Sequence, residues 1–520
     1  MTWRRAIFLA LVLLLAAAAC GDGEPGRGEA RAGGRVAGAP GASFVLLTLD
    51  TTRADRLGAY GGPQGATPNL DALAREGAFF ERVYAVAPTT LPAHATLFTG
   101  VDPTRHGLRH NGVHFLGDDA VTLAEVLQCR GFATAAFVSS AVLERRYGLA
   151  QGFAVYDDDC RAPRRALGRY AERQAADTVD RALAWLDSAP PNARFFLWVH
   201  LYDPHAEFAA PEPFAATWKS DPYTGEIAYM DAQIGRLLAH PRLGPGTLIS
   251  AIGDHGESLG EHGEANHGML LYEGTLRVPW LVRGPGVVAG RRVDEPAAQV
   301  DLVPTALDLL AIDAPASSPT GDRGRSWAAT LANEDGARGP GKPSPAHDEG
   351  AMARVLYSET LAPFLSYGWA PLHAVRRGAW KLIDGPSPEL YDTERDPGEL
   401  DNRIGTEKAI ARELGRALEA IAAADVGSAA PAPLDAAEAE KLRSLGYLTT
   451  AHPRRPDQEL PDPKAMIAVH RRLGEAQQSL LAGDAAAAAA ELAAVVAQDP
   501  GNVTALETQA TALTRLEPRR

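Results

Sequence analysis

Cysteine and methionine are scarce in this 520-residue chain, and aromatic residues are few. The chain has 3 cysteines and 5 methionines, and 7% of its residues are aromatic. Cys20 closes the N-terminal leader described below, so Cys129 and Cys160 are the two that remain within the folded chain. One disulfide bond between them is possible, but a fold held together by a disulfide framework is excluded. Neither has neighbours typical of a metal site or a nucleophile, so both are taken as structural.

Positive charge is also in deficit. The chain carries 51 Lys and Arg against 65 Asp and Glu, a formal net charge of -14. This balance argues against a nucleic-acid partner. The length and the 46% hydrophobic content are sufficient for a large core and for two or three domains.

The first 20 residues are a targeting segment rather than part of the fold. Arg4 and Arg5 precede an apolar run, and small residues at 16–19 lead to Cys20. The run is too short to span a membrane comfortably. Small residues before a cysteine resemble a bacterial lipoprotein signal, so we expect export to the periplasmic side of the cell envelope and a lipid anchor at Cys20. Simple cleavage and release is the alternative, and residues 21–42 are typical of a flexible tether.

Four largely apolar runs predict strands that are buried on both faces. They are residues 43–49, 133–138, 194–201 and 247–252. Helical patterns alternate with these strands, at residues 67–77, 123–127 and 176–186. The alternation predicts an α/β fold with a mostly parallel sheet and helices on both faces.

The second half of the chain predicts two smaller units. A polar segment rich in Gly and Pro at 331–350 indicates a loop or boundary. Short strands at 354–359 and 373–383 and a helix at 407–424 then form a small α+β subdomain. The predicted units are the leader 1–20, the linker 21–42, a catalytic domain 43–330, the loop 331–350, a C-terminal subdomain 351–450 and a helical segment 451–520.

The last segment has three helical stretches, at 465–481, at 485–497 and from residue 504. Their order resembles a tetratricopeptide hairpin followed by the start of the next one. One and a half repeats are too few for a free-standing solenoid. We therefore expect this tail to pack on the catalytic domain or to bind a protein partner; an alanine-rich tail of weak helices is the alternative.

Ionisable side chains follow three of the predicted strands. They are Asp50, the pair Asp203 and His205, and the pair Asp254 and His255. In open α/β sheets, ligands bind beyond the carboxyl ends of the strands. Carboxylate oxygens and imidazole nitrogens are typical ligands of divalent cations, so these endings predict one shared metal site.

Residues 87–100 predict a loop that leads into a short helix. Pro92 suits a first helical turn and Gly100 a C-terminal stop. Thr89 and Thr90 then lie near the positive end of the helix dipole, where a phosphate or sulfate group is stabilised. The alternative is that both threonines only cap the helix.

These motifs, taken in order, resemble the sulfatase family of the alkaline-phosphatase-like superfamily. The matching segments are residues 48–55, 67–71, 87–100, 106–107, 202–205, 254–257 and 277–279, with 380–382 and 389–392 in the C-terminal subdomain. The resemblance extends from about residue 44 to residue 402. It implies a metal-dependent hydrolase of sulfate or phosphate esters that acts on a small-molecule, glycan or lipid ester.

The resemblance departs from sulfatases at the nucleophile. Their pattern is Cys-x-Pro-x-Arg, with the Cys or a Ser oxidised to formylglycine, whereas this chain has Thr90, Pro92 and His94. The Cβ of threonine already carries a methyl group, so it cannot be oxidised to an aldehyde and no formylglycine is expected. Threonine at this position resembles the phosphodiesterase and phosphoethanolamine-transferase branches of the superfamily.

Two further positions differ from the family pattern. Thr51 stands where a second aspartate is usual, and His267 stands where a lysine often contacts the ester oxygens. The implied ligands of one divalent ion, calcium, manganese or zinc, are Asp50, Thr90, Asp254 and His255. The implied catalytic residues are Thr90 as nucleophile, His205 and His267 on the ester oxygens, and His94, which is as consistent with packing as with catalysis.

Two other classes of function stay open. One is a phosphoethanolamine-type transferase that acts on an envelope glycan or lipid. The other is an inactive metal-binding scaffold whose work is done by the helical tail.

Overall fold

The computed structural model describes residues 39–160, 172–314, 323–332, 354–431 and 459–516. The leader, Cys20, nearly all of the tether and most of the predicted loop 331–350 lie outside these ranges. None of the helices within them is both long enough and apolar enough to cross a membrane.

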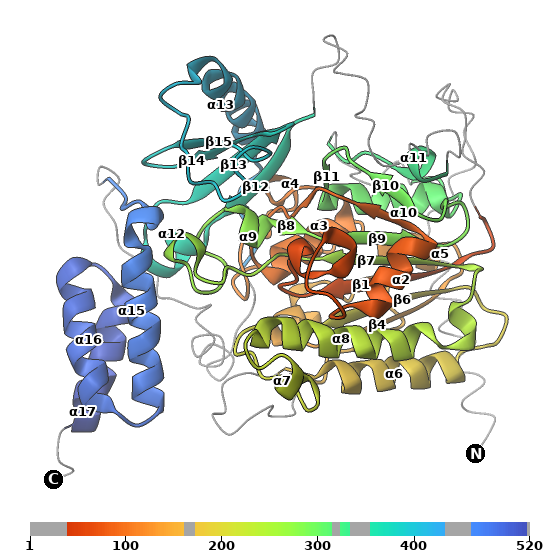
Figure 1. Ribbon diagram of the computed structural model, residues 1–520, viewed down its shortest axis with the longest axis horizontal. Helices are drawn as coiled ribbons and strands as arrows, with labels where there is room; N and C mark the ends of the chain where they lie inside the picture. Colours follow the sequence, from red (N-terminus) through yellow and green to blue (C-terminus); the bar gives the residue numbers. More distant parts are fainter. Residues whose placement is uncertain (1–38, 161–171, 315–322, 333–353, 432–458, 517–520) are drawn as a thin grey trace.

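A sheet of eight strands forms the centre of the molecule (Figure 1). Its strands are β1 (Ser43–Leu49), β2 (Ala78–Phe80), β4 (Ala133–Phe137), β5 (Val155–Asp157), β6 (Phe195–Leu201), β7 (Thr247–Gly253), β9 (Trp280–Arg283) and β10 (Arg291–Val293). The order is β10-β2-β9-β7-β1-β6-β4-β5, and β9 alone runs antiparallel to its neighbours in this sheet. The predicted α/β class with a mostly parallel sheet is therefore confirmed.

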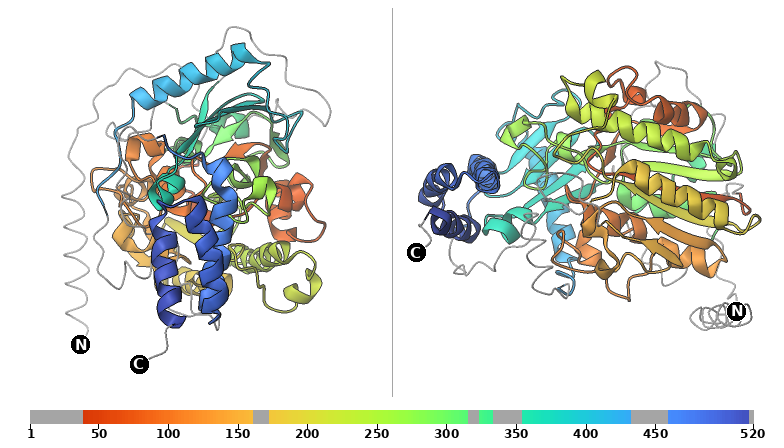
Figure 2. Two further views of the ribbon diagram at one scale, coloured as in Figure 1. Left: turned by 90° about the vertical axis from the view of Figure 1, so that its left-hand side faces the viewer. Right: turned by 90° about the horizontal axis from the view of Figure 1, so that it is seen from below.

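Helices cover both faces of this sheet because side chains alternate along each buried strand. Val45 and Leu47 of β1 pack with α2 (Pro68–Glu76), α6 (Ala175–Ser188) and α8 (Pro222–Leu238). Phe44 and Leu46 point the other way and belong to the core under α3 (Thr90–Thr99), α5 (Leu123–Cys129) and α10 (Leu302–Leu309). Figure 2 shows the two helical layers around the sheet.

The C-terminal subdomain is an antiparallel sheet with one long helix. Its strands are β12 (Leu356–Thr360), β13 (Leu372–Arg377), β14 (Trp380–Asp384) and β15 (Glu389–Asp392), and the helix is α13 (Lys408–Ala423). The single strand expected at 373–383 is two strands, because Gly378 takes a positive φ of 60° and turns the chain. The subdomain joins the catalytic domain where the N–H of Glu359 donates to the carbonyl of Val86 at 2.9 Å.

Short elements connect these layers. A three-stranded sheet consists of β11 (Ala297–Ala298), β3 (Val83–Tyr84) and β8 (Arg277–Val278). The short α-helices are α4 (Pro103–His106), α7 (Phe214–Thr217), α9 (Glu273–Leu276), α11 (Ala328–Ala332) and α12 (Ala362–Tyr367). The single-turn 3-10 helices are η1 (Ala54–Arg56), η2 (Gly58–Tyr60), η3 (Ala141–Leu143), η4 (Arg145–Tyr147), η5 (Pro241–Leu243), η6 (Glu261–Gly263) and η7 (Gln299–Asp301). Cys129 is exposed at the end of α5 and is not bonded to Cys160.

The tail forms three helices that lie side by side at one end of the molecule (Figures 1 and 2). They are α15 (Pro463–Leu481), α16 (Ala485–Gln498) and α17 (Val503–Leu516). The indole N–H of Trp369 donates to Asp499 Oδ2 at 2.7 Å, and the hydroxyl of Tyr367 lies 3.0 Å from His470 Nδ1. The three predicted helical stretches are confirmed, and they pack against α12, the residues that follow it, and the turn η6.

Candidate active site

Three predicted metal ligands meet at the carboxyl ends of two neighbouring strands. β1 and β7 are parallel and Leu49 pairs with Gly253, so Asp50 and Asp254 follow at the same level of the sheet. Asp50, Asp254 and His255 are fully buried, and each offers a ligand atom within 4.8 Å of the other two.

The donor set of this cluster fits a divalent cation. Asp50 Oδ1 and Asp254 Oδ2 are buried oxygens with no hydrogen-bond partner among the residues that the structure describes. His255 Nδ1 lies 3.0 Å from the carbonyl of Gly256, which can only accept, so Nδ1 carries the proton and Nε2 keeps a lone pair. Two buried carboxylate oxygens and an imidazole nitrogen are a plausible set of metal ligands.

Burial also disfavours negative charge at this cluster when no cation offsets it. Burial raises the pKa of Asp50 to about 7. Burial, followed by the nearby charge of Asp50, raises the pKa of Asp254. A bound cation would reverse this penalty, since it favours both ionised carboxylates.

Thr90 faces the cluster from the first residue of α3. Its Oγ1 lies 3.3 Å from His255 Nε2 and 3.5 Å from Asp50 Oδ2. Thr89 is the N-cap residue but makes no side-chain capping bond, and the N–H of Leu91 donates to Asn111 Oδ1 at 2.8 Å instead. The alternative that both threonines cap the helix is therefore wrong.

Thr51, in the position of the usual second aspartate, acts through its backbone. It has a left-handed φ of 47°, a conformation that is costly for a β-branched residue. This conformation accompanies a hydrogen bond of 3.2 Å from the Thr51 N–H to Asp254 Oδ1. The turn after β1 therefore helps to orient a carboxylate that follows β7.

His94 lies behind the cluster, where the chain engages both nitrogens of its ring. Nδ1 lies 2.7 Å from the carbonyl of Thr90, and Nε2 lies 3.0 Å from Thr48 Oγ1. Trp198 Nε1 donates to that same hydroxyl at 2.9 Å, so the Thr48 proton points at His94 and Nδ1 of His94 carries the other proton. Burial lowers the pKa of His94 to about 3, which keeps the ring neutral. The two contacts of the His94 ring therefore link the start of α3 to Thr48 of β1.

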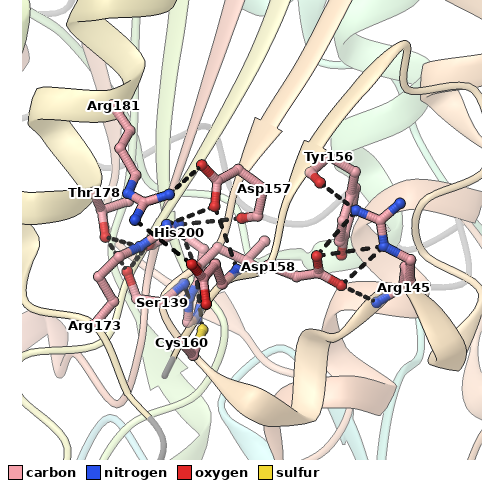
Figure 3. A network of polar contacts seen from close by, with 12 residues as sticks. Ser139, Arg145, Tyr156, Asp157, Asp158, Cys160, Arg173, Thr178, Arg181 and His200 are labelled. Atoms are coloured by element: carbon pink, nitrogen blue, oxygen red, sulfur yellow. Dashed lines mark hydrogen bonds and ion pairs between the residues drawn. The ribbon is translucent and has the colours of Figure 1, made fainter. Parts of the chain in front are cut away.

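His200 on β6 holds the other side of Asp50, and no sequence motif pointed to it. The N–H of Ser139 donates to His200 Nδ1 at 3.3 Å, so the ring proton is on Nε2, which lies 3.1 Å from Asp50 Oδ2. Ser139 in turn contacts Thr178, whose hydroxyl accepts from Arg173 (Figure 3). His94 and His200 could also form a metal-binding group with Asp254, but both nitrogens of each ring already have partners in the chain.

His205 and His267 form the less buried side of the site. Their ring centroids are 5.0 Å apart, and the ring of His267 is 4.4 Å from that of His255. Burial lowers the pKa of His205 well below its usual value and that of His267 to about 4. Glu257, which sequence reasoning assigned to no role, is fully buried and its Oε1 lies 3.0 Å from His267 Nδ1.

The structure thus brings Asp50, Thr90, Asp254, His255 and His267 together, with His205 beside His267. The orienting residues Thr48 and His200 were missed because their partners are distant in the sequence, and Glu257 because its contact with His267 depends on how the loop closes. The one indication in the sequence was that Glu257 lies two residues after His255 in segment 254–257, which resembles a sulfatase motif. The possible metal ligands at the carboxyl edge of the central sheet face a hydroxyl at a helix N-terminus, which is the place where open α/β sheets bind ligands and where an anionic group is stabilised.

Comparison with known proteins specifies the class. The family model named Sulfatase matches residues 42–312. The chain is 24% identical over 436 residues to an uncharacterized sulfatase, YidJ, of Escherichia coli K12, a match that covers 70% of this chain and 83% of the relative. It is 25% identical over 414 residues to the ulvan-active sulfatase of Formosa agariphila, with 70% and 77% covered.

A solved structure supports the fold. The phosphonate monoester hydrolase of Agrobacterium radiobacter superposes with a TM-score of 0.58 at 22% identity, and the match covers 74% of this chain and 96% of that one. The chain belongs to the sulfatase family, and it is an ester hydrolase of the sulfuric-ester class. The family is metal-dependent.

Proposed function

We propose that this protein is a metal-dependent hydrolase of sulfate or phosphate esters in which Thr90 is the nucleophile. One observation carries the proposal: Thr90 Oγ1 lies 3.3 Å from His255 Nε2 and 3.5 Å from Asp50 Oδ2. A hydroxyl at a helix N-terminus that faces a buried cluster of metal ligands is placed to attack a tetrahedral ester.

The residues that would hold one divalent ion are Asp50, Thr90, Asp254 and His255. The two unpartnered carboxylate oxygens and the lone pair on His255 Nε2 support this assignment. When bound there, a divalent ion supplies positive charge that lowers the pKa of the Thr90 hydroxyl and offsets charge on the ester. Calcium, manganese and zinc are the candidates, and the imidazole ligand favours a transition metal.

The remaining chemistry belongs to the chain. Thr90 Oγ1 forms a bond to phosphorus or sulfur, the bond to the leaving oxygen breaks, and the hydroxyl proton leaves along the contact with Asp50 Oδ2. His205 or His267 binds the non-bridging oxygens, and the negative charge of the bound ester favours the protonated ring. The protonated ring then gives its proton to the leaving oxygen. Water then attacks the same phosphorus or sulfur and gives one proton to that histidine. The bond to Thr90 Oγ1 breaks, Thr90 takes back the proton held at Asp50 Oδ2, and the acid is released.

This route differs from that of a formylglycine sulfatase. A hydrated aldehyde expels sulfate by breaking its own C–O bond, whereas Thr90 has no second hydroxyl and must be released by attack at phosphorus or sulfur. That requirement favours phosphate or phosphonate esters over sulfate esters. His94, with both ring nitrogens engaged, positions α3 in this account and does not contact substrate.

We also propose a location and a substrate class. The lipoprotein-type signal supports an exported protein anchored at Cys20 in the cell envelope. One relative is named for its activity on ulvan, which supports a glycan ester as substrate. The helical tail, which resembles a tetratricopeptide hairpin, would then bind a protein partner through surfaces not used against the catalytic domain.

A panel of p-nitrophenyl sulfate, phosphate monoester, phosphodiester and phosphonate substrates tests this function, together with the metal content of the purified protein. We expect turnover of at least one phosphorus ester, loss of turnover on chelation, and loss in Thr90→Ala at unchanged metal content. A metal-loaded protein without turnover on any ester would favour the scaffold. Transfer to a glycan or lipid acceptor in place of water would favour the transferase.

A further inference from the structure

Glu257 is a buried acidic residue for which the proposed chemistry gives no task. It lies on the loop after β7, two residues beyond His255, and it is fully buried. Its Oε1 lies 3.0 Å from His267 Nδ1, and no second side chain within the described ranges forms a hydrogen bond with it. A buried carboxyl group without a partner is strongly disfavoured. The partners of the Glu257 carboxyl group are the ring of His267 and the backbone of Ala206.

The loop between the two residues is closed so that they face each other. The N–H of Ser258 donates to the carbonyl of Asn266 at 2.8 Å, and the N–H of Gly260 donates to the carbonyl of Glu264 at 3.0 Å. Because residues 258 and 266 are opposite each other in this closed loop, residues 257 and 267 form the next pair. The backbone thus places the carboxyl group and the imidazole within reach before any substrate binds.

Two contacts hold the far end of the loop. The buried carboxylate of Glu264 accepts the N–H of Met269 at 2.7 Å and that of Leu270 at 3.3 Å. Gly268 has a φ of 105°, which favours glycine, and its carbonyl accepts the hydroxyl of Thr360. The chain around His267 is therefore fixed, and its ring orientation depends on what the ring nitrogens contact.

We propose that Glu257 is a positioning residue that holds His267 by Nδ1 and so presents Nε2 of His267 to the leaving oxygen of the ester. No hydrogen bond to Nε2 of His267 is found within the part of the chain that the structure describes. The ring of His267 lies between those of His205 and His255, at the less buried side of the site. A carboxyl group on the second nitrogen of an active-site histidine fixes both the orientation and the tautomer of the ring. This inference rests on the proposed role of His267.

The test uses esters with good and poor leaving groups in matched variants of the full chain. His267→Ala should lower kcat on phenyl esters by about 100-fold or more, and on p-nitrophenyl esters by much less, because p-nitrophenolate leaves without a proton. Glu257→Leu, which has a similar volume and no acceptor, should show the same dependence on the leaving group with a loss of about 10- to 100-fold. Glu257→Gln, which keeps an acceptor oxygen, should restore kcat to within about tenfold of the wild type.

The double variant Glu257→Leu/His267→Ala separates positioning from structure. If Glu257 acts through His267, its substitution should change kcat by less than about threefold in the His267→Ala background. An equal loss in both backgrounds, or an equal loss on both kinds of leaving group, would overturn the inference. So would a Gln variant as impaired as His267→Ala, and this comparison remains decisive if the Leu variant does not fold.

Metal content and Thr90→Ala, measured in parallel, separate this inference from the proposed function. Suppose that metal content is normal, that Thr90→Ala is inactive, and that the Glu257 and His267 variants keep full activity. This result would contradict the role of Glu257 and His267 and would leave the role of Thr90 as nucleophile supported. Full activity of Thr90→Ala would instead contradict the proposed function itself.

Discussion

The site has two sides that are built differently. On the metal side, Asp50, Asp254 and His255 follow directly after two adjacent parallel strands, and the strand register aligns them. On the ester side, His205 and His267 belong to loops, and Nδ1 of His267 lies 3.0 Å from Glu257 Oε1. Positions set by strand register tolerate little change, whereas positions set by side-chain contacts can weaken by degrees. Substitutions on the metal side should therefore remove function outright, and those on the ester side should reduce it.

The largest effect is expected from Asp254→Asn. The change keeps the shape of the side chain but removes one charged oxygen ligand, so the ion should be lost and turnover should fall at least about 1,000-fold. Metal per chain by mass spectrometry and kcat on a p-nitrophenyl ester measure the two effects. Asp308→Asn on α10, an exposed position, is the matched control and should change neither. Retention of stoichiometric metal in Asp254→Asn would contradict the assignment of Asp254 as a metal ligand and the contrast between the two sides.

A graded loss is expected from His205→Ala. The ring contributes general acid catalysis or binding of ester oxygens, so kcat should fall about 100- to 10,000-fold while the metal content stays unchanged. The same two measurements apply. Loss of the ion in this variant would show that His205 supports metal binding and would contradict the division of the site into a metal side and an ester side.

The pH dependence of metal binding is a smaller effect that belongs to the metal side. Burial raises the pKa of Asp50 from 3.8 to about 7 in the metal-free fold. Protonated Asp50 leaves the metal-free protein at its full stability below the unfolded pKa of 3.8. This stability is lost as pH rises through the folded pKa of about 7, because the buried carboxyl group must then ionise. A bound ion displaces the proton, so its stabilising effect should grow with pH.

The Tm difference between metal-loaded and metal-free protein checks this sign. It should be larger at about pH 8 than at about pH 5, where protons compete with the ion for Asp50. Other buried carboxyl groups, such as Glu264, contribute equally to both forms and cancel in the difference. A difference that shrinks as pH rises would contradict the assignment of Asp50 as a ligand.

The smallest effect on activity is expected at the contact between the helical tail and Trp369. Asp499→Ala leaves the buried indole N–H of Trp369 without its acceptor, which should lower the free energy of unfolding by about 1–3 kcal/mol. Because none of residues 459–516 of the tail belongs to the site, kcat on small esters should stay the same. Denaturant unfolding and kcat measure the two outcomes, and a parallel fall in kcat would show that the tail supports the site.

The sheet and the metal side could be predicted from the sequence because their determinants are local. The apolar runs that predict β1, β6 and β7 differ by at most one residue at either end from the observed strands. Ionisable residues directly after such strands must meet at one edge if the strands are parallel and adjacent. The sequence could not show that β1 and β7 are neighbours, so the meeting of Asp50 with Asp254 remained a hypothesis until the structure placed the strands.

The ester side was predicted less completely because it depends on how a loop closes and on side-chain contacts that no local pattern specifies. Glu257 and His267 meet because a hydrogen bond between Ser258 and Asn266 closes the loop. No pattern in the sequence predicts this closure. The direction of His94 depends on a hydroxyl from β1 and an indole from β6. In the C-terminal subdomain, the strand predicted at 373–383 is two strands that turn at Gly378.

Chemical trapping of the nucleophile tests the central claim most directly. The protein, quenched by acid during turnover of a slow p-nitrophenyl phosphodiester, is digested and the peptide that contains Thr90 is analysed by mass spectrometry. The account predicts a phosphoryl adduct on Thr90 in the wild type, no adduct in Thr90→Ala, and turnover of that variant reduced by several orders of magnitude at unchanged metal content. Full turnover by Thr90→Ala, or an adduct on another residue, would contradict it.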